Sequence, residues 1–492
     1  MKNEPTTQTL FFTMFTRPKV ILWLLLLAAA SGCQTGRTVT FLQINDVYEI
    51  APLNNGKSGG LARVAYLEKQ LKKENPKSTY FVLAGDFLSP SVTGTLRHNG
   101  ERIQGKQMVD VLNTAGLDYV TFGNHEFDYD DKGPTVLQKR IEESTFRWVV
   151  ANMQLRDGNK TVPFSKDGAN FPTSVILDNG KVRVGLFGVC IPVNKDFVQV
   201  ADPFEAARRE YEDLKNRCDV VVALTHLDIA DDKRLAEQLP NLTLIMGGHD
   251  HDHMMVKVGK VPIAKADANA KTAYIHRLYF DRKSRLVRLE SELKTIDETV
   301  PEEPKTAAVV AKWQQIAAES FRELGFEPTE VVYTTPEPWD GLEATVRREH
   351  GALTSTIAQS LFAAFPGSDL AVFNGGSVRI DDVLEGPISQ YDIVRILPFG
   401  GGISQAKMKG DFLQKVLEAG RLSRGKGGFL HHANARYDEA TRVWYIGNLP
   451  LDAQRVYQVV LPDFLLTGKE FGMSFLIPAN PGIVPPIVTP AK

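Results

Sequence analysis

Short apolar runs alternate with longer amphipathic segments from residue 38 to about residue 260. Runs rich in Val, Ile, Leu and Phe predict strands at 39–44, 79–83, 119–122, 147–151, 182–188, 219–224 and 242–246. Segment 61–74 is a predicted helix, with Leu61, Val64 and Leu71 on one face and Lys and Glu on the other. Further helices are predicted at 105–115, 133–143 and 203–216. Strands that alternate with helices in this way indicate an α/β domain whose sheets are buried on both faces.

The pattern changes after residue 260, and 492 residues are too many for one hydrophobic core, so we expect two domains. Segments 272–281 and 284–293 are a predicted hairpin. The later predicted elements are a helix at 305–324, helices 352–365 and 409–419, and strands 370–373, 442–446 and 456–461. The resulting division is a targeting segment 1–33, a first domain 38–300, a connecting helix 301–326, a smaller α+β domain 327–477 and a proline-rich, loosely ordered tail 478–492.

Potential metal ligands follow directly after five predicted strands. They are Asp46, Asp86, the group Asn124, His125, Glu126 and Asp128, then His226, and finally His249 with His251. Because sites in open α/β sheets form beyond the carboxyl ends of strands, we expect these five loops to converge. A lone Asp or His after a strand is more often a turn or structural residue, but five such endings in register favour a metal site.

The side chains in these loops suit a hard or borderline divalent cation, which prefers carboxylate, amide and imidazole donors. Two such ions about 3.5–4 Å apart can polarise a phosphoryl group and lower the pKa of a bound water. Asp86 is the best candidate to bridge two ions, because its loop is central in sequence order. We expect His249 and His251 to lie on the same side of an extended loop, where each can serve one ion or both can share one.

A glycine pair and an arginine follow predicted strand 370–373, in the segment NGGSVR at 374–379. Arg379 offers a planar fork that suits a phosphate or a carboxylate. The alternative is a plain turn with a solvated arginine.

Taken together, the strand-end residues resemble those of the calcineurin-like metallophosphoesterase superfamily. Within it, GNHEFD at 123–128 and the second domain are similar to the bacterial 5′-nucleotidase family, over about residues 38–475. The resemblance implies a four-layer α/β/β/α sandwich followed by a smaller α+β substrate-binding domain. It also implies two divalent metal ions (Mn, Mg, Zn or similar) and attack on phosphorus by a metal-bound hydroxide.

The resemblance also implies a role for each motif residue. Asp86 would bridge the ions, and the remaining metal ligands would be Asn124, His226 and His249 at one site and Asp46 and His251 at the other. His125 would stabilise charge or protonate the leaving oxygen, and Asp128 would orient its imidazole. Substrate contacts would come from Asn374, Gly376 and Arg379, and the nucleobase would lie between Phe429 and Phe471. The alternative for both phenylalanines is a place in the core.

Two segments depart from the family pattern. The first strand of the family ends in Asp-x-His, whereas this chain has Tyr48 after Asp46 and Val47. A phenol has a pKa near 10 and is a poor ligand for most divalent ions, so we expect a weakened first site. The segment before Phe471, Thr467 to Glu470, also differs from the family's glycine-rich pattern, which leaves base recognition open.

The N-terminus has the features of an export signal. Arg17 and Lys19 precede the apolar run 20–30, and small residues lead to Cys33. The segment resembles a bacterial lipobox, which implies a periplasmic or cell-surface protein attached to the membrane through a lipidated Cys33. An uncleaved signal anchor is the alternative. The two remaining cysteines, Cys190 and Cys218, are expected to be free thiols.

The net charge of −2 indicates no nucleic-acid polymer as partner, and no protein partner is inferred. We therefore expect a 5′-nucleotidase-like enzyme that hydrolyses nucleotide phosphomonoesters at the cell envelope, in nucleotide catabolism. A nucleotide-sugar pyrophosphatase and a 2′,3′-cyclic nucleotide phosphodiesterase are the alternatives of the same class. The alternative of another class is a non-catalytic surface nucleotide-binding lipoprotein, which Tyr48 favours.

Overall fold

The protein is described by a computed structural model that covers residues 37–54, 56–130, 132–158 and 160–489. The predicted export signal and Cys33 lie outside the described residues. Within the described ranges, no helix has the length and apolar character needed to cross a membrane. Cys190 and Cys218 are both free, as the sequence predicts.

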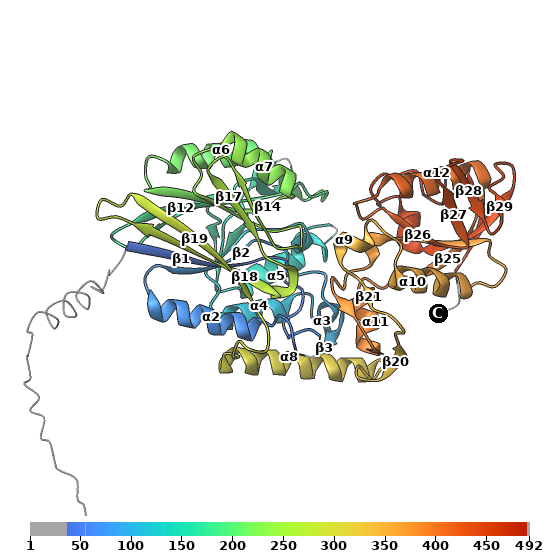
Figure 1. Ribbon diagram of the computed structural model, residues 1–492, viewed down its shortest axis with the longest axis horizontal. Helices are drawn as coiled ribbons and strands as arrows, with labels where there is room; N and C mark the ends of the chain where they lie inside the picture. The colour runs from blue at the N-terminus through green and yellow to red at the C-terminus, as the bar shows by residue number, and fades with distance from the viewer. Residues whose placement is uncertain (1–36, 55, 131, 159, 490–492) are drawn as a thin grey trace, which may run out of the picture.

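Two six-stranded sheets make up the first domain (Figure 1). In spatial order the first sheet contains β19 (Leu286–Thr295), β18 (Thr272–Phe280), β1 (Arg37–Ile44), β2 (Thr79–Leu83), β5 (Tyr119–Val120) and β6 (Arg147–Trp148). The second contains β11 (Ser174–Asp178), β12 (Arg183–Cys190), β14 (Val220–His226), β15 (Leu244–Gly247), β17 (Val261–Lys265) and β16 (Met254–Val258). The strands β1, β2, β5 and β6 run parallel, as do β12, β14, β15 and β17.

The sheets pack face to face and each carries helices on its outer face. Side chains of a strand point alternately to its two faces, and in β1 both faces are apolar. Phe41 lies in the core between the sheets, whereas Leu42 and Ile44 lie in the core beneath the outer helices. The helices α2 (Leu61–Glu74), α4 (Lys106–Ala115), α5 (Thr135–Glu143) and α8 (Pro304–Glu323) cover the first sheet, and α6 (Pro203–Leu214) and α7 (Ile229–Gln238) cover the second (Figure 1). The four-layer α/β/β/α sandwich predicted from the sequence is thus confirmed.

Helix α8 leads from the first domain to the second (Figure 1). Glu303 caps its N-terminus, where its side chain accepts the backbone N–H of Thr306 at 2.7 Å. Trp313 and Phe321 of α8 are buried in the core of the first domain, so the connecting helix is part of that domain's packing.

A five-stranded sheet forms the second domain, in the order β26 (Leu430–Ala433), β22 (Leu370–Asn374), β30 (Val456–Pro462), β25 (Ile403–Lys409) and β31 (Ile483–Val488). Helix α10 (Ala352–Ala363) packs on one face of this sheet and α12 (Gly410–Leu422) on the other. A smaller sheet of β27 (Ala435–Asp438), β28 (Val443–Ile446) and β29 (Leu449–Pro450) lies beside it. The α+β class of this domain is as predicted.

The prediction of a loosely ordered tail was wrong for residues 483–488, which form strand β31. This strand pairs with β25 at the edge of the sheet. An edge strand leaves one side unpaired, so Pro485 and Pro486, which lack an N–H, are tolerated there. Helix α7 and strands β16 and β17 were not predicted from the sequence.

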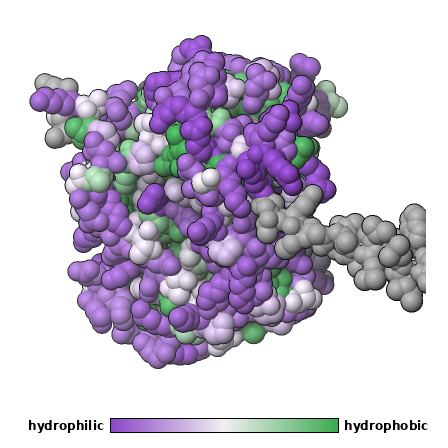
Figure 2. All heavy atoms as spheres, turned by 90° about the vertical axis from the view of Figure 1, so that its left-hand side faces the viewer, coloured by the Kyte–Doolittle hydropathy of each residue, from purple (hydrophilic) through white to green (hydrophobic). Residues whose placement is uncertain are grey.

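Figure 2 looks at the end of the first domain that lies away from the second domain. Hydrophilic residues cover most of this face, and hydrophobic residues form only small groups on it. The large apolar side chains of the first domain instead lie in its layered core, where Phe41, Phe81 and Phe122 are fully buried.

Candidate metal centre

The five predicted ligand loops meet at one edge of the two stacked sheets, beyond the carboxyl ends of β1, β2, β5, β14 and β15. Backbone strain is concentrated there: Asp46, Asp86, His249 and His251 all have positive φ, at 51°, 58°, 82° and 61°. Non-glycine residues rarely adopt this conformation, and it persists only where the surrounding structure holds it. The loop with His249 and His251 is therefore not extended as predicted, and the two imidazoles face different partners.

Glycines let these loops approach one another. A Cβ on Gly123 would lie 2.1 Å from Asp86 Oδ1, and one on Gly248 would lie 2.4 Å from the carbonyl oxygen of Ala84. Both distances are far below van der Waals contact, so only glycine fits.

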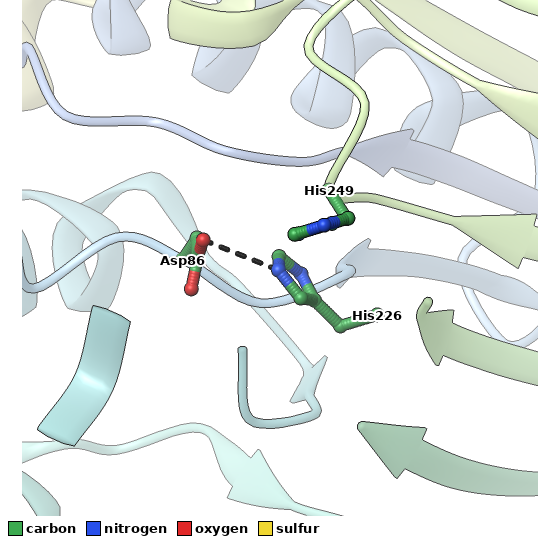
Figure 3. Close-up of side chains that lie close together, drawn as sticks. All are labelled: Asp86, His226 and His249. Carbon is green, nitrogen blue, oxygen red and sulfur yellow. Dashed lines mark ion pairs between the residues drawn. The ribbon is translucent and has the colours of Figure 1, made fainter. Parts of the chain in front are cut away.

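Asp86, His226 and His249 form a compact group of donors (Figure 3). Their ligand atoms all lie within 4.8 Å of one another, and His226 Nε2 is 3.1 Å from Asp86 Oδ2. His226 Nδ1 donates to the carbonyl oxygen of Ala84 at 2.7 Å, which leaves Nε2 as the free ring nitrogen. This is the tautomer that a metal ligand requires.

Two buried atoms at this group lack a hydrogen-bond partner. They are Asn124 Oδ1 and His226 Nε2. Buried polar atoms usually have a hydrogen-bond partner. Two buried atoms that lack one and can offer a lone pair, next to a carboxylate, therefore fit a cation site. We call Asp86, Asn124, His226 and His249 the second site.

The negative charges of Asp86 and Asp46 also favour a cation at the second site. Burial disfavours a charged His226, yet Asp86 and Asp46 raise its pKa to about 9, so positive charge is stabilised at this point. Burial and His226 lower the pKa of His249 well below its ordinary value, which keeps this imidazole neutral and able to ligate.

Tyr48, Asp46 and His251 lie next to the second site, at what we call the first site. The Tyr48 hydroxyl oxygen is 3.0 Å from His251 Nε2, 3.3 Å from Asp86 Oδ2 and 3.4 Å from Asp46 Oδ1. Burial and the two carboxylates raise the pKa of Tyr48 well above its ordinary value, so the phenol keeps its proton. Across the part of the chain that the structure describes, the donors of this site form no compact group like that of the second site.

Two further residues hold the loops in place, and sequence reasoning missed both roles. The buried Glu126 carboxylate accepts backbone N–H groups from Asp86 at 3.0 Å and from Phe87 at 2.8 Å. Lys265, whose side chain is 0% exposed, donates to the carbonyl oxygens of Leu227 at 2.6 Å and Gly248 at 2.8 Å. These carbonyls adjoin His226 and His249, so Lys265 fixes the ends of the two strands that carry them.

His125 stands between the metal centre and the second domain. Its Nδ1–H donates to Asp128 Oδ2 at 2.7 Å, and its Nε2 lies 2.7 Å from Arg379 Nη2. Ser89 Oγ also donates to Asp128 Oδ2, at 3.0 Å. The Asp128 carboxylate holds the ring proton at Nδ1, so Nε2 accepts from the Arg379 guanidinium and is the ring nitrogen that faces the second domain.

Two carboxylates of the second domain also reach the metal centre. Asp381 Oδ2 and Glu343 Oε2 lie 3.3 and 3.6 Å from His251 Nδ1, and Lys271 of the first domain donates to the carbonyl oxygen of Asp381 at 2.8 Å. No local sequence signal marks Asp381 or Glu343, because their place depends on how the domains dock.

The predicted substrate residues of the second domain occupy one region around the end of β22. Asn374 Nδ2 donates to Glu470 Oε2 at 2.6 Å, and the Gly376 N–H donates to the carbonyl oxygen of Gly427 at 2.8 Å. Phe429 is only 6% exposed, whereas Phe471 is 64% exposed. Among the described residues these two rings do not contact each other, and the ring neighbours of Phe429 are His350 and His431, each at 5.3 Å between ring centroids.

Comparisons with known proteins agree with this architecture. Residues 39–253 match the family described as calcineurin-like phosphoesterase, and residues 331–475 match the 5′-nucleotidase, C-terminal domain. A 5′-nucleotidase from Bos taurus is 25% identical over 88% of this chain and 83% of its own, and an apyrase from Aedes albopictus is 25% identical over 88% and 84%. A crystal structure of a 5′-nucleotidase precursor from Thermus thermophilus superposes with a TM-score of 0.73 at 23% identity, covering 88% of this chain and 90% of that one.

Proposed function

Since the chain belongs to the 5′-nucleotidase family of calcineurin-like metallophosphoesterases and is a hydrolase, we propose that it hydrolyses nucleotide phosphomonoesters in the cleft between its domains. The observation that carries the proposal is the meeting of His125, Arg379 and the second site. A cation site, a protonatable imidazole and a guanidinium fork are the parts that phosphoryl transfer to water needs.

A calcineurin-like phosphoesterase domain implies divalent metal ions, and the second site fits one of them. When bound, the ion would supply Lewis acidity to the phosphoryl group and lower the pKa of a coordinated water. The pair of ions expected from the sequence requires a further ion at the first site, whose geometry is different.

The side chains of this protein would bind the phosphate, supply a proton and hold the base. Arg379 would bind two phosphoryl oxygens with its fork and place phosphorus over the second site. His125 would carry a proton at Nε2 and give it to the leaving ester oxygen, while Asp128 stabilises the imidazolium through Nδ1. The exposed ring of Phe471 would stack on the nucleobase, and Asn374 would contact the substrate beside it.

A substrate panel tests this function. Phosphate release from AMP, UMP and ADP, and chromatographic separation of the products formed from a nucleotide sugar and 2′,3′-cyclic AMP, are measured with Mn²⁺, Mg²⁺ or Zn²⁺, with and without chelator. We expect chelator-sensitive release from the monophosphates. Preference for the nucleotide sugar or the cyclic diester would support those alternatives, and no activity on any phosphoester would support the non-catalytic binding protein.

We also propose export and membrane attachment through a lipidated Cys33, which rests on the sequence of residues 17–33 alone. Incorporation of a labelled fatty acid in cells tests it, with Cys33→Ala as the matched control. Label in the variant equal to that in the natural chain would contradict the proposal.

A further inference from the structure

The first site differs from the second in what occupies its centre. Tyr48 stands where the resemblance places a histidine ligand, and its side chain is buried with 4% exposure. A phenol extends further from Cβ than an imidazole does, so its oxygen reaches past the position of a histidine nitrogen and into the space between the other donors.

The distances around the Tyr48 hydroxyl are those of hydrogen-bonding partners. It lies 3.0–3.4 Å from one atom each of Asp46, Asp86 and His251. A divalent ion such as Zn²⁺ needs nitrogen and oxygen donors at about 2.0–2.2 Å, so two donors of one ion are at most about 4.4 Å apart. In the described part of the chain, Asp46, Asp86 and His251 do not all come within 4.8 Å of one another, whereas Asp86, His226 and His249 do.

The donors of the first site are also engaged with other protein groups. Asp46 Oδ2 accepts from Asn45 Nδ2 at 2.8 Å and from the His249 N–H at 2.9 Å, and its Oδ1 faces the Tyr48 hydroxyl. His251 lies between Tyr48 and Asp381. Its Nε2 faces the Tyr48 hydroxyl and Asp46 Oδ1, at 3.0 and 3.4 Å, and its Nδ1, which has no hydrogen-bond partner, lies on the side of Asp381. In the second site the unpartnered buried atoms are Asn124 Oδ1 and His226 Nε2, next to Asp86.

Positive charge reaches this region from the second domain. The half-buried Arg379 guanidinium interacts electrostatically with Tyr48 and with Asp86. A guanidinium held beside the carboxylates compensates part of their negative charge without an ion at the first site.

We propose that this chain binds a single divalent cation, at the second site, and that the Tyr48 hydroxyl occupies the place of a first-site ion. The inference rests on the proposed function for its setting, but it concerns the number of ions and is tested without activity. The chain is then a one-ion phosphoesterase in which Tyr48 and Arg379 face the phosphoryl group where a first ion would.

The test is the metal content of four proteins: the natural chain, Tyr48→His, Tyr48→Phe and Asn124→Ala. Each is stripped with chelator, titrated with Mn²⁺ by calorimetry and analysed by elemental mass spectrometry. We expect one ion in the natural chain and in Tyr48→Phe, two in Tyr48→His, and an at least tenfold weaker single site in Asn124→Ala.

Two tightly bound ions in the natural chain would overturn the inference, as would no gain of an ion in Tyr48→His. Loss of an ion in Tyr48→Phe would also overturn it, because the phenol would then be a ligand. The substrate panel described above is run on the same samples. Activity with two ions refutes only this inference, whereas one ion without activity on any phosphoester refutes only the proposed function.

Discussion

Arg379 Nη2 and His125 Nε2 lie 2.7 Å apart, although 254 positions separate the two residues and they belong to different domains. The contact places a guanidinium from the second domain directly on the imidazole that stands beside the metal centre. The docking of the domains therefore completes the site, because the guanidinium that would bind the phosphate at this point comes from the second domain.

Arg379→Ala is expected to lower kcat/KM for AMP by about 10²–10³-fold, the usual cost of removing one donor aimed at a developing charge. Arg379→Lys should recover little, because an ammonium cannot reproduce the fork. Arg208→Ala, which removes a 59% exposed arginine on α6, serves as the control. Steady-state kinetics with equal metal loading measure the effect, and full activity in Arg379→Ala would remove this residue from the mechanism.

Lys265→Met is expected to destabilise the fold by about 3–5 kcal/mol, because it leaves the buried Asp232, 2.8 Å away, without a compensating charge. The same substitution frees the carbonyls of Leu227 and Gly248, so Mn²⁺ should bind the second site more weakly. Chemical denaturation and calorimetric titration measure the two effects, with the exposed Lys260→Met as control. Unchanged stability and metal affinity would show that Lys265 does not hold the loops.

His276 is expected to make the folded chain less stable in acid. Burial lowers its pKa to about 3, and the neutral ring is satisfied by Gln43 Oε1 at 2.9 Å and Ser291 Oγ at 2.7 Å. The unfolded chain takes up the proton near pH 6.5 and the folded chain does not, so this residue costs stability as pH falls from about 6.5 to about 3.

The slope from this one proton is about 1.4 kcal/mol per pH unit at most. It should appear in the difference between the unfolding free energies of the natural chain and His276→Gln, measured by denaturant titration at several pH values. A difference that stays constant with pH would mean that His276 is not held neutral.

The two predicted base-stacking residues should behave differently, because Phe471 is exposed and Phe429 is buried. Phe471→Ala should lose about 1–3 kcal/mol of stacking, which is roughly 5- to 150-fold in kcat/KM for AMP. Hydrolysis of ribose 5-phosphate, which has no base, should not change. Phe429→Ala should instead lower the melting temperature. Equal losses on AMP and ribose 5-phosphate in Phe471→Ala would exclude base stacking.

The sequence predicted the convergence of the ligand loops because parallel strands end at one edge of a sheet. Asp86 after β2 of the first sheet and His226 at the end of β14 of the second are neighbours because the two stacked sheets present these strand ends at the same edge. Family membership, the hydrolase class and the layered fold were confirmed, whereas the roles of the individual site residues stay predictions.

Other features depend on tertiary packing and left no local signal. Lys265 sits in the short run Val261–Lys265, where a terminal lysine is normally solvated, and only the folded chain surrounds it with four acceptors. The sequence showed Tyr48 to depart from the family pattern. The position of its hydroxyl among three potential metal ligands, however, follows from side-chain length and loop strain. The burial of Phe429 likewise depends on the packing of His350 and His431 against it.

Two histidines of one loop offer a sharp test of the metal centre. His249 belongs to the second site, whereas the His253 side chain is 54% exposed and pairs with Asp267 at 2.9 Å. Mn²⁺-dependent phosphate release from AMP is measured for the natural chain, His249→Ala and His253→Ala. We expect at least a hundredfold loss in His249→Ala and less than a twofold change in His253→Ala, whereas equal activity of the two variants would rule out a metal centre at the second site.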